Sequence, residues 1–361
     1  MKKHLIAAAV AAAVAVPAMA QNVSISGYIE AGYQDLSLKG DATTRTNEEL
    51  KAFTAGPFGS SRLVISGSED LGGGLKAGFR LESSLDVVNG RLGASSLAGQ
   101  AGSNTGEFFN RGAELNLSGA FGMVRIGQFD HRGGEDTDLN VVGNIAIATG
   151  MTTQNSTAAG VEIGSDRKGT IAYRTPTMGG ITFEVAHSTE DGQKTSGTVD
   201  ATGAGVGAVQ SYYAEGKIGN IGFRAGHATQ AAIGAITAGN NDAKRTGAGV
   251  SYDFGVASAS IHYATATLID QTENKKTVVS VKVPLSGSLD VRGVYRNFNT
   301  SNDGATTTAA ADRKEYTIAL ANALSKRTTA YAAFTNFDRT STNAVGNTDS
   351  KRVFLGVGHS F

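Results

Sequence analysis

The chain has 361 residues, with 32 basic and 32 acidic side chains, no cysteine and no tryptophan. Near-neutral charge argues against a nucleic-acid-binding protein, which would carry a basic excess. The lack of cysteine excludes a disulfide framework, a thiolate nucleophile and a cysteine metal site. No segment after the first twenty residues approaches 18 consecutive apolar residues, and the mean hydropathy of −0.13 does not suit a helical membrane protein.

Residues 1–20 have the pattern of a secretory signal peptide. A start with Lys2 and Lys3 is followed by a short apolar stretch over residues 5–16 and by a small-x-small cleavage site, Ala18-Met19-Ala20. The apolar stretch is too short to cross a hydrocarbon core of about 30 Å as a helix. We therefore expect export, cleavage, and one barrel domain over residues 21–361.

Segments of about ten residues with alternating apolar and polar positions follow along the exported part, which is the period of a two-faced strand. In one of them, Leu75 and Phe79 share a face, while Arg80 and Glu82 lie on the other. Similar segments cover residues 171–175, 247–254, 289–296 and 315–320. Soluble sandwiches also alternate in this way, so the strands alone leave the fold class open.

The connections between these segments alternate between short and long. The short ones lie at residues 69–74, 118–122, 176–180, 219–220, near 255, 285–288 and 323–325. The long ones lie at roughly 37–57, 85–105, 131–167, 190–209, 231–243, 268–274, 300–311 and 339–350. Seven short and eight long connections separate sixteen strands. This organisation predicts an all-β fold, a transmembrane antiparallel up-and-down β-barrel of 16 strands with long external loops and short periplasmic turns. Closure removes the free edges of such a sheet.

The final segment, residues 353–361, alternates up to its last residue. Val353, Leu355, Val357 and Phe361 point one way, and Phe354, Gly356, Gly358 and Ser360 point the other. A strand with an aromatic residue at its end is typical of the closing strand of an outer-membrane barrel. The segment therefore agrees with the barrel that the connections predict.

Three stretches resemble the general diffusion porins of Gram-negative bacteria, especially the beta-proteobacterial type. They are Gly27-Tyr28-Ile29-Glu30-Ala31-Gly32, the strand-turn-strand unit from Ser61 to Ala77 with its Glu-Asp-Leu-Gly-Gly-Gly turn, and the unit from Ala113 to Gln128. The chain departs from the family at Glu30, where Asp is common, and at Gln128, where Arg is frequent. Losing a cation at Gln128 could weaken anion preference, so the sign of selectivity stays open.

The resemblance implies a homotrimer in the cell outer membrane, in contact with outer-membrane lipid and lipopolysaccharide. Each barrel would hold a water-filled pore for passive transport of ions and small hydrophilic solutes, without a cofactor. The resemblance also implies that Phe361 and its strand are an assembly signal for the barrel assembly machinery.

The longest connection, about residues 131–167, corresponds to the loop that folds into the barrel and narrows the pore in the resembled family. Four acidic residues lie at its start, namely Asp130, Glu135, Asp136 and Asp138. A run of aliphatic and small residues follows over 141–148, which would suit packing against the inner wall of the barrel. A loop this long in a compact domain is usually functional.

Arginines on the wall would complete a charged constriction opposite that loop. Strand parity places Arg62, Arg80, Arg125 and Arg174 toward the lumen, together with Arg224 and Arg292. An arginine facing lipid at the midplane costs about 2–4 kcal/mol, so energy also favours the lumen. The alternative interpretation is that these arginines form structural salt bridges with Glu82, Glu114 and Glu184 on the same inner surface. Charged side chains facing one another across a narrow passage would set ion preference.

Other functions find less support in the sequence. An outer-membrane hydrolase would need a nucleophile and base in reach of each other, but the histidines are scattered singly and none sits in a Gly-x-Ser-x-Gly or His-Glu-x-x-His setting. The acidic residues at the start of the long loop lack EF-hand spacing, so no metal site is expected. A substrate-selective channel for small acids, sugars or peptides, or a surface adhesin on the same barrel, remains the alternative to a general diffusion porin.

Overall fold

The computed structural model describes residues 22–40, 48–55, 59–92, 108–135, 141–142, 167–189, 205–233, 242–268, 272–301, 311–341 and 348–361. Its elements in chain order are β1 (Asn22–Gly40), β2 (Glu48–Ala55), β3 (Arg62–Gly72), β4 (Leu75–Asp86), β5 (Arg91–Leu92), β6 (Gly112–Gly119), β7 (Gly122–Phe129), α2 (Arg132–Glu135), β8 (Arg167–Arg174), β9 (Ile181–Ser188), β10 (Gly205–Ile218), β11 (Ile221–Ile233), β12 (Ala243–Asp253), β13 (Ser258–Thr267), β14 (Glu273–Pro284), β15 (Leu289–Ser301), β16 (Ala311–Ala323), β17 (Thr328–Ser341) and β18 (Thr348–Ser360). Among these residues, no helix is long and apolar enough to cross a membrane.

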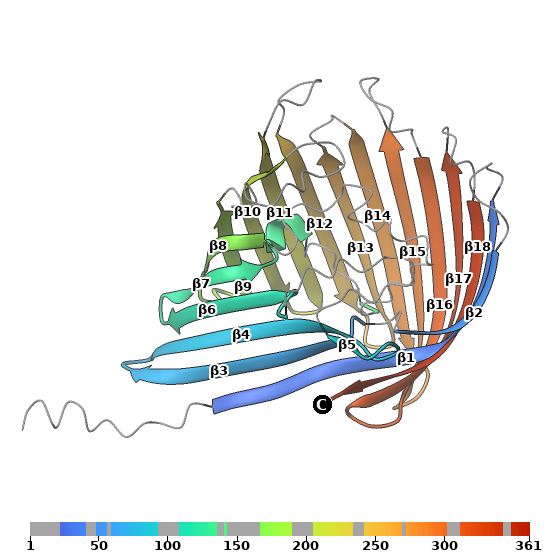
Figure 1. Cartoon of the computed structure of the whole chain (residues 1–361), viewed down its shortest axis with the longest axis horizontal. Coiled ribbons are helices and arrows are strands. Elements are labelled where there is room, and N and C mark those ends of the chain that lie inside the picture. The colour runs from blue at the N-terminus through green and yellow to red at the C-terminus, as the bar shows by residue number, and fades with distance from the viewer. Residues whose placement is uncertain are drawn as a thin grey trace, which may run out of the picture.

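The strands form one closed antiparallel wall (Figure 1). Neighbours along the chain pair with one another, and β1 closes the ring by pairing with β18. β2 and β3 pair with successive parts of β1 and together occupy one position in the wall. β5 is a two-residue addition beside the end of β4. In the described part of the chain, the eighteen strands therefore fill sixteen positions, which confirms the predicted 16-strand barrel.

Short turns join seven pairs of described strands, namely β3 and β4, β6 and β7, β8 and β9, β10 and β11, β12 and β13, β14 and β15, and β16 and β17. The first of these turns uses three glycines, Gly72, Gly73 and Gly74, with φ values of 84°, 61° and 81°. Side chains other than glycine avoid this left-handed region, which explains the glycine run of the predicted turn. The other connections contain most of the residues outside the described ranges, so short and long connections alternate as expected.

The two faces of the wall differ as the alternation predicts. Large apolar side chains such as Leu115, Ile126 and Ile318 are exposed on the outer face, at 69%, 57% and 57% of their surface. This face is the one that lipid covers in an outer-membrane barrel. Polar, charged and small side chains point inward, together with a compact apolar cluster formed by Val142, Val278, Val294, Ala319, Ala333 and Phe354.

The seam between β1 and β18 is closed by one inward aromatic side chain and by the chain end. The ring of Phe354 lies against Gly32 and Gly356, where an added Cβ would come within 2.4 Å of the ring. Phe354 is fully buried there. Beyond it, the backbone of Phe361 both donates to and accepts from Gly27, with N···O distances of 3.1 Å. Glycines on both strands of the seam therefore leave the room that the aromatic ring occupies.

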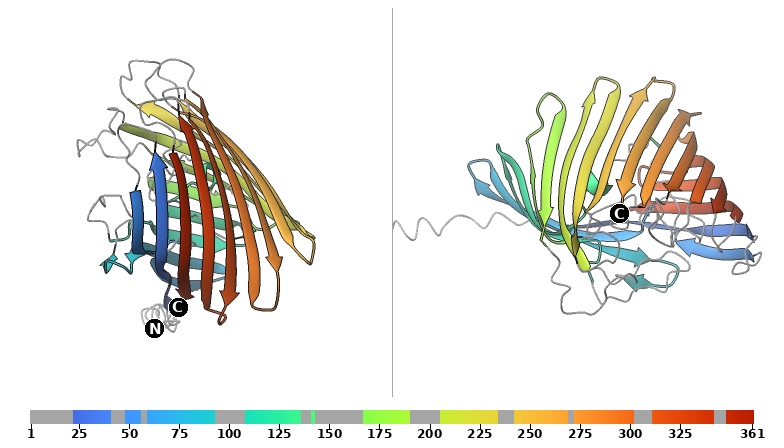
Figure 2. Two further views of the ribbon diagram at one scale, coloured as in Figure 1. Left: turned by 90° about the vertical axis from the view of Figure 1, so that its right-hand side faces the viewer. Right: turned by 90° about the horizontal axis from the view of Figure 1, so that it is seen from above.

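Several details differ from the sequence-based expectation. The first long connection is shorter than residues 37–57, because β1 runs to Gly40 and β2 begins at Glu48. The second wall strand is interrupted between Ala55 and Arg62. This segment contains the turn signal Gly56-Pro57, which the expectation placed at the end of the first long connection. The short helix α2 and the strand pair of β4 with β5 were not predicted either. Figure 2 (right) shows α2 inside the ring of strands.

Candidate functional site

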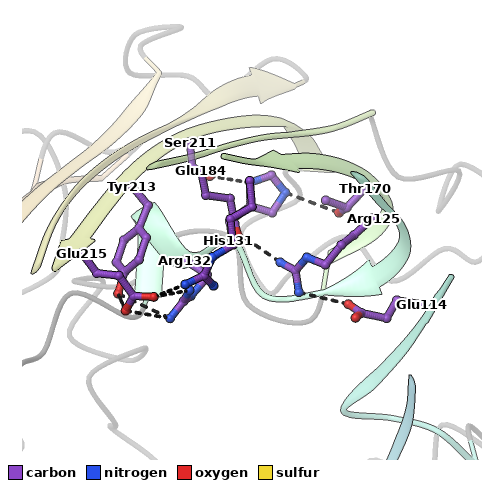
Figure 3. Close-up of polar contacts among 10 residues, drawn as sticks. Glu114, Arg125, His131, Arg132, Thr170, Glu184, Ser211, Tyr213 and Glu215 are labelled. Atoms are coloured by element: carbon purple, nitrogen blue, oxygen red, sulfur yellow. Dashed lines mark hydrogen bonds and ion pairs between the residues drawn. The ribbon is translucent and has the colours of Figure 1, made fainter. Parts of the chain in front are cut away.

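The chain that follows β7 turns against the inner face of the wall. His131 is fully buried, with Nδ1 at 3.1 Å from the hydroxyl of Ser211 on β10 and Nε2 at 3.4 Å from the hydroxyl of Thr170 on β8 (Figure 3). The next residues form α2, which contacts β9 to β12. Arg245 of β12 donates to the carbonyl oxygen of Gly133 at 3.2 Å. The backbone of Gly133 lies close to β10, since a Cβ added to Gly133 would be 2.4 Å from the carbonyl oxygen of Tyr212.

A few residues further on, the same connection contacts a different part of the wall. The backbone N–H of Val141 donates to the hydroxyl of Ser280 on β14 at 3.2 Å, and Arg292 of β15 donates to the carbonyl of Val142 at 2.9 Å. Val142 is 1% exposed in the apolar cluster with Phe354. These contacts agree with the expectation that the aliphatic run packs on the inner wall, as far as the described residues reach. Asp136, Asp138 and residues 143–148 lie outside them.

Glu215 of β10 is the centre of the first charged group (Figure 3). Arg132 binds both of its carboxylate oxygens, at 3.0 and 3.2 Å. Arg174 of β8 donates to the Oε1 atom, and Arg224 of β11 lies with Nε 3.6 Å from the Oε2 atom. The hydroxyl of Tyr213 donates to Oε2 at 2.9 Å. We call this arrangement of three arginines around one carboxylate the Glu215 nest.

Glu82 of β4 forms a second arrangement of the same kind, the Glu82 nest. Arg111 donates to its Oε1 atom at 2.7 Å, and Arg80 donates to Oε2. Arg62 lies with Nε 3.8 Å from Oε1. The side chains of Arg62 and Arg80 remain 40% and 46% exposed, so both face open space as well as the carboxylate.

Arg125 of β7 lies in a third arrangement with the opposite balance of charge. It donates to Glu114 of β6 at 3.0 Å and to Glu184 of β9 at 3.3 Å, and its guanidinium lies 4.2 Å from the centre of the Phe129 ring. Glu184 is 3% exposed. One arginine therefore holds two carboxylates here, whereas three arginines hold one carboxylate in each nest.

The three arrangements together carry more positive than negative charge. They contain seven arginines and four glutamates, a formal balance of +3. All lie on the inner face of the wall between β3 and β11, on the connection that follows β7 or, for Arg111, directly before β6. Charges in a confined passage with low-dielectric walls act more strongly than charges on an open surface. Taken by itself, this group places an excess of positive charge on the inner wall.

The four arginines expected on the constriction wall, Arg62, Arg80, Arg125 and Arg174, all lie on the inner face, and each is paired with a glutamate. The geometry thus agrees with the salt-bridge interpretation, and it also leaves two of these arginines partly exposed. Of the acidic loop residues, Asp130 is exposed directly after β7 and Glu135 ends α2.

Sequence reasoning missed Arg111, Arg132, Glu215 and Tyr213 as members of the site. Arg111 precedes β6 and Arg132 lies in α2 after β7, so the alternation of a strand could not assign their side chains to the inner or outer face. The parity of β10 was ambiguous because Tyr212 and Tyr213 are adjacent aromatics. Tyr213 proves to be the inward one, at 4% exposure, while Tyr212 faces outward. Among the described residues, no group of three or more histidine, cysteine or acidic side chains is placed to hold a metal ion.

Comparisons with known proteins agree with the barrel fold. The protein family described as Gram-negative porin matches residues 7–342. Outer membrane porin protein 32 of Delftia acidovorans is 29% identical over 99% of this chain and 95% of that protein, and an outer membrane porin of Bordetella pertussis is 28% identical over 74% and 70%. Among solved structures, an anion-selective porin from Comamonas acidovorans superposes with a TM-score of 0.71 and 23% identity, covering 94% of this chain and all of that one.

Proposed function

The chain belongs to the Gram-negative porin family and is a diffusion porin of the outer membrane, and from this premise we propose that its pore favours small anions over cations. As a member of a family of passive channels it is not an enzyme. Ions and small hydrophilic solutes cross such a pore by diffusion, so no step in transport requires a cofactor.

The excess of arginine over glutamate in the inner arrangements carries the proposal of anion preference. The partly exposed Arg62 and Arg80 support it, because guanidinium groups that still face open space can act on a passing solute. Charged side chains lining a pore raise the local concentration of ions of opposite sign. The relative from Comamonas acidovorans that has a similar fold is described as anion-selective. Gln128, at the position where the family often has Arg, does not remove this excess.

We propose that Arg62, Arg80, Arg125 and Arg174 form the basic side of the pore constriction, and that Asp130, Glu135, Asp136 and Asp138 form its acidic side. The inward turn of the chain at His131 and the docking of Val142 on the opposite wall support a constriction loop within residues 131–167. Opposed charges would produce a field across the passage, in which polar solutes orient and cross.

Further proposals concern export and assembly. Residues 1–20 act as a cleaved signal peptide, Phe361 is part of an assembly signal for the barrel assembly machinery, and the assembled form is a homotrimer. Contact with lipopolysaccharide is supported by the exposed lysines Lys275, Lys314 and Lys351, which stand near one rim of β14, β16 and β18. Ammonium groups at this height could pair with lipid phosphates.

Planar-bilayer recording of the purified protein tests the anion preference. With a KCl gradient across the bilayer, we expect a reversal potential displaced toward the chloride equilibrium potential. Conductance that falls in three equal steps would support the trimer. A reversal potential near that of potassium would overturn the anion preference, and tight saturable binding of one sugar or peptide would favour a substrate-selective channel instead.

A further inference from the structure

We infer that Glu82 and Glu215 are built-in competitors for solute anions. Each carboxylate occupies the place among three arginines where a carboxylate of a passing solute would otherwise bind. This inference rests on the anion preference proposed above. It names the residues that keep the binding of anions in the pore weak. The solutes concerned are small di- and tricarboxylates, whose end groups have the chemistry of a glutamate side chain.

The contacts within the Glu215 nest are those that a bound solute carboxylate would receive. Arg132 reaches both oxygens in a bidentate manner, which is the strongest pairing of guanidinium with carboxylate. Arg174 and the hydroxyl of Tyr213 donate one further hydrogen bond to each oxygen. A solute carboxylate has the same two oxygens at the same spacing, so it would have to displace Glu215 to obtain these bonds.

The Glu82 nest repeats the arrangement on a separate pair of strands. Arg111 donates to Oε1 of Glu82 and Arg80 donates to Oε2, while Nε of Arg62 lies 3.8 Å from Oε1. Each nest therefore has a formal charge of +2, three cations against one anion. The uncompensated charge still attracts an anion from a distance, while the nearest hydrogen-bond donors are already occupied.

Guanidinium donors that are already bonded to Glu82 or Glu215 favour transport, because a channel must let a solute enter readily and also leave. A carboxylate tethered to the wall acts at an effective concentration of order millimolar or above. A solute anion at lower concentration competes poorly for the donors, so its residence time stays short. Without the glutamate, three guanidinium groups would hold a polycarboxylate and block the pore.

The pair of Glu114 and Glu184 around Arg125 provides a matched control. Replacing Glu114 by Gln removes the same charge from the same wall as replacing Glu215, but it leaves Arg125 bound to Glu184. Only the change at a nest opens a site with three guanidinium groups. The difference between the two variants therefore separates competition from net charge.

The experiment records citrate block of KCl current through the full-length protein in planar bilayers, for the wild type, Glu82→Gln, Glu215→Gln and Glu114→Gln. Heat-modifiable migration on gels first establishes that each variant is folded. We expect each nest variant to lower the half-blocking citrate concentration by about tenfold or more, the effect of about 1.4 kcal/mol of freed charge-assisted hydrogen bonding. The Glu114→Gln variant should lower it by less than about threefold.

Equal block in all three variants would show that net charge alone matters and would overturn the inference, as would unchanged block in both nest variants. If Glu215→Gln fails to fold, Glu82→Gln in the other nest decides, together with Glu215→Asp, whose shorter side chain should give a smaller increase in block. The proposed anion preference is tested separately by the reversal potential of the wild type. A cation-selective wild type would overturn that preference, whereas the competitor role depends only on the difference between the variants.

Discussion

Two parts of the inner wall hold their side chains in different ways. Between β3 and β11, arginines and glutamates pair with one another, and several remain partly exposed in the lumen. Between β14 and β18, the wall also carries ion pairs such as Arg292–Asp290 and Arg296–Glu315, but it adds the apolar cluster around Phe354, on which Val142 of the long connection packs. The first part holds paired and partly exposed charge, and the second fixes the connection and the seam. We therefore expect changes in the first to alter selectivity and changes in the second to alter stability and pore size.

The largest effect is expected at the seam. Phe354→Ala removes a fully buried ring that lies on Gly32 and Gly356, and such a truncation costs about 3–5 kcal/mol. The temperature at which the folded band disappears in a heat-modifiability series should fall clearly, with the ion selectivity of surviving channels unchanged. Leu355→Ala, one position along on the lipid face, is the control and should cost less. Equal losses for the two variants would contradict a special role for the inner cluster.

The next largest effect is expected at Val142, where a substitution tests whether this residue anchors the long connection to the wall. Val142→Asp places a charge in an apolar cluster and loses the burial of the side chain, which together cost about 2 kcal/mol or more. The connection should leave the wall, and single-channel conductance should change while the barrel stays folded. Val142→Thr keeps the shape and should change conductance much less. Unchanged conductance in Val142→Asp would mean that the docked segment does not limit the pore.

A smaller effect, confined to selectivity, is expected in the Glu215 nest. Replacing both Arg174 and Arg224 by Gln removes two cations from the pore wall and leaves Arg132 to hold Glu215. The permeability ratio of chloride to potassium should fall several-fold, as measured by reversal potentials, with little change in thermal stability. A large loss of stability would show that this part of the wall is structural as well.

The smallest effect is expected for Arg62→Gln. Its side chain is 40% exposed and stands 3.8 Å from Glu82, so its contribution to folding should be below about 1 kcal/mol. A small shift in reversal potential without a change in the heat-modifiability temperature is the expected result. Arg111→Gln, which removes the 2.7 Å contact in the same nest, should have the larger effect on stability.

The barrel could be predicted because its signals are local. Alternation assigns each side chain to a face, and glycine runs such as Gly72 to Gly74 mark the turns. The two nests were harder to predict from the sequence. Arg111 and Arg132 lie outside strands, so strand parity does not assign their side chains to a face. Their meeting with Glu82 and Glu215 depends on how connections fold over the wall. Gly56-Pro57 marks a break between β2 and β3, but no local signal encodes the pairing of both strands with successive parts of β1.

The pairing of β1 with β18 also constrains the order of folding. Tyr28 stands opposite Ser360, so the first strand of the wall receives its final partner only when the segment farthest from it in the sequence is available. Contacts between such distant segments form slowly, because a long loop must close before they are gained. Until then, β1 and β18 each present an unpaired edge that another chain could join. An exported chain of this topology thus depends on protection from aggregation between its synthesis and the moment the ring closes.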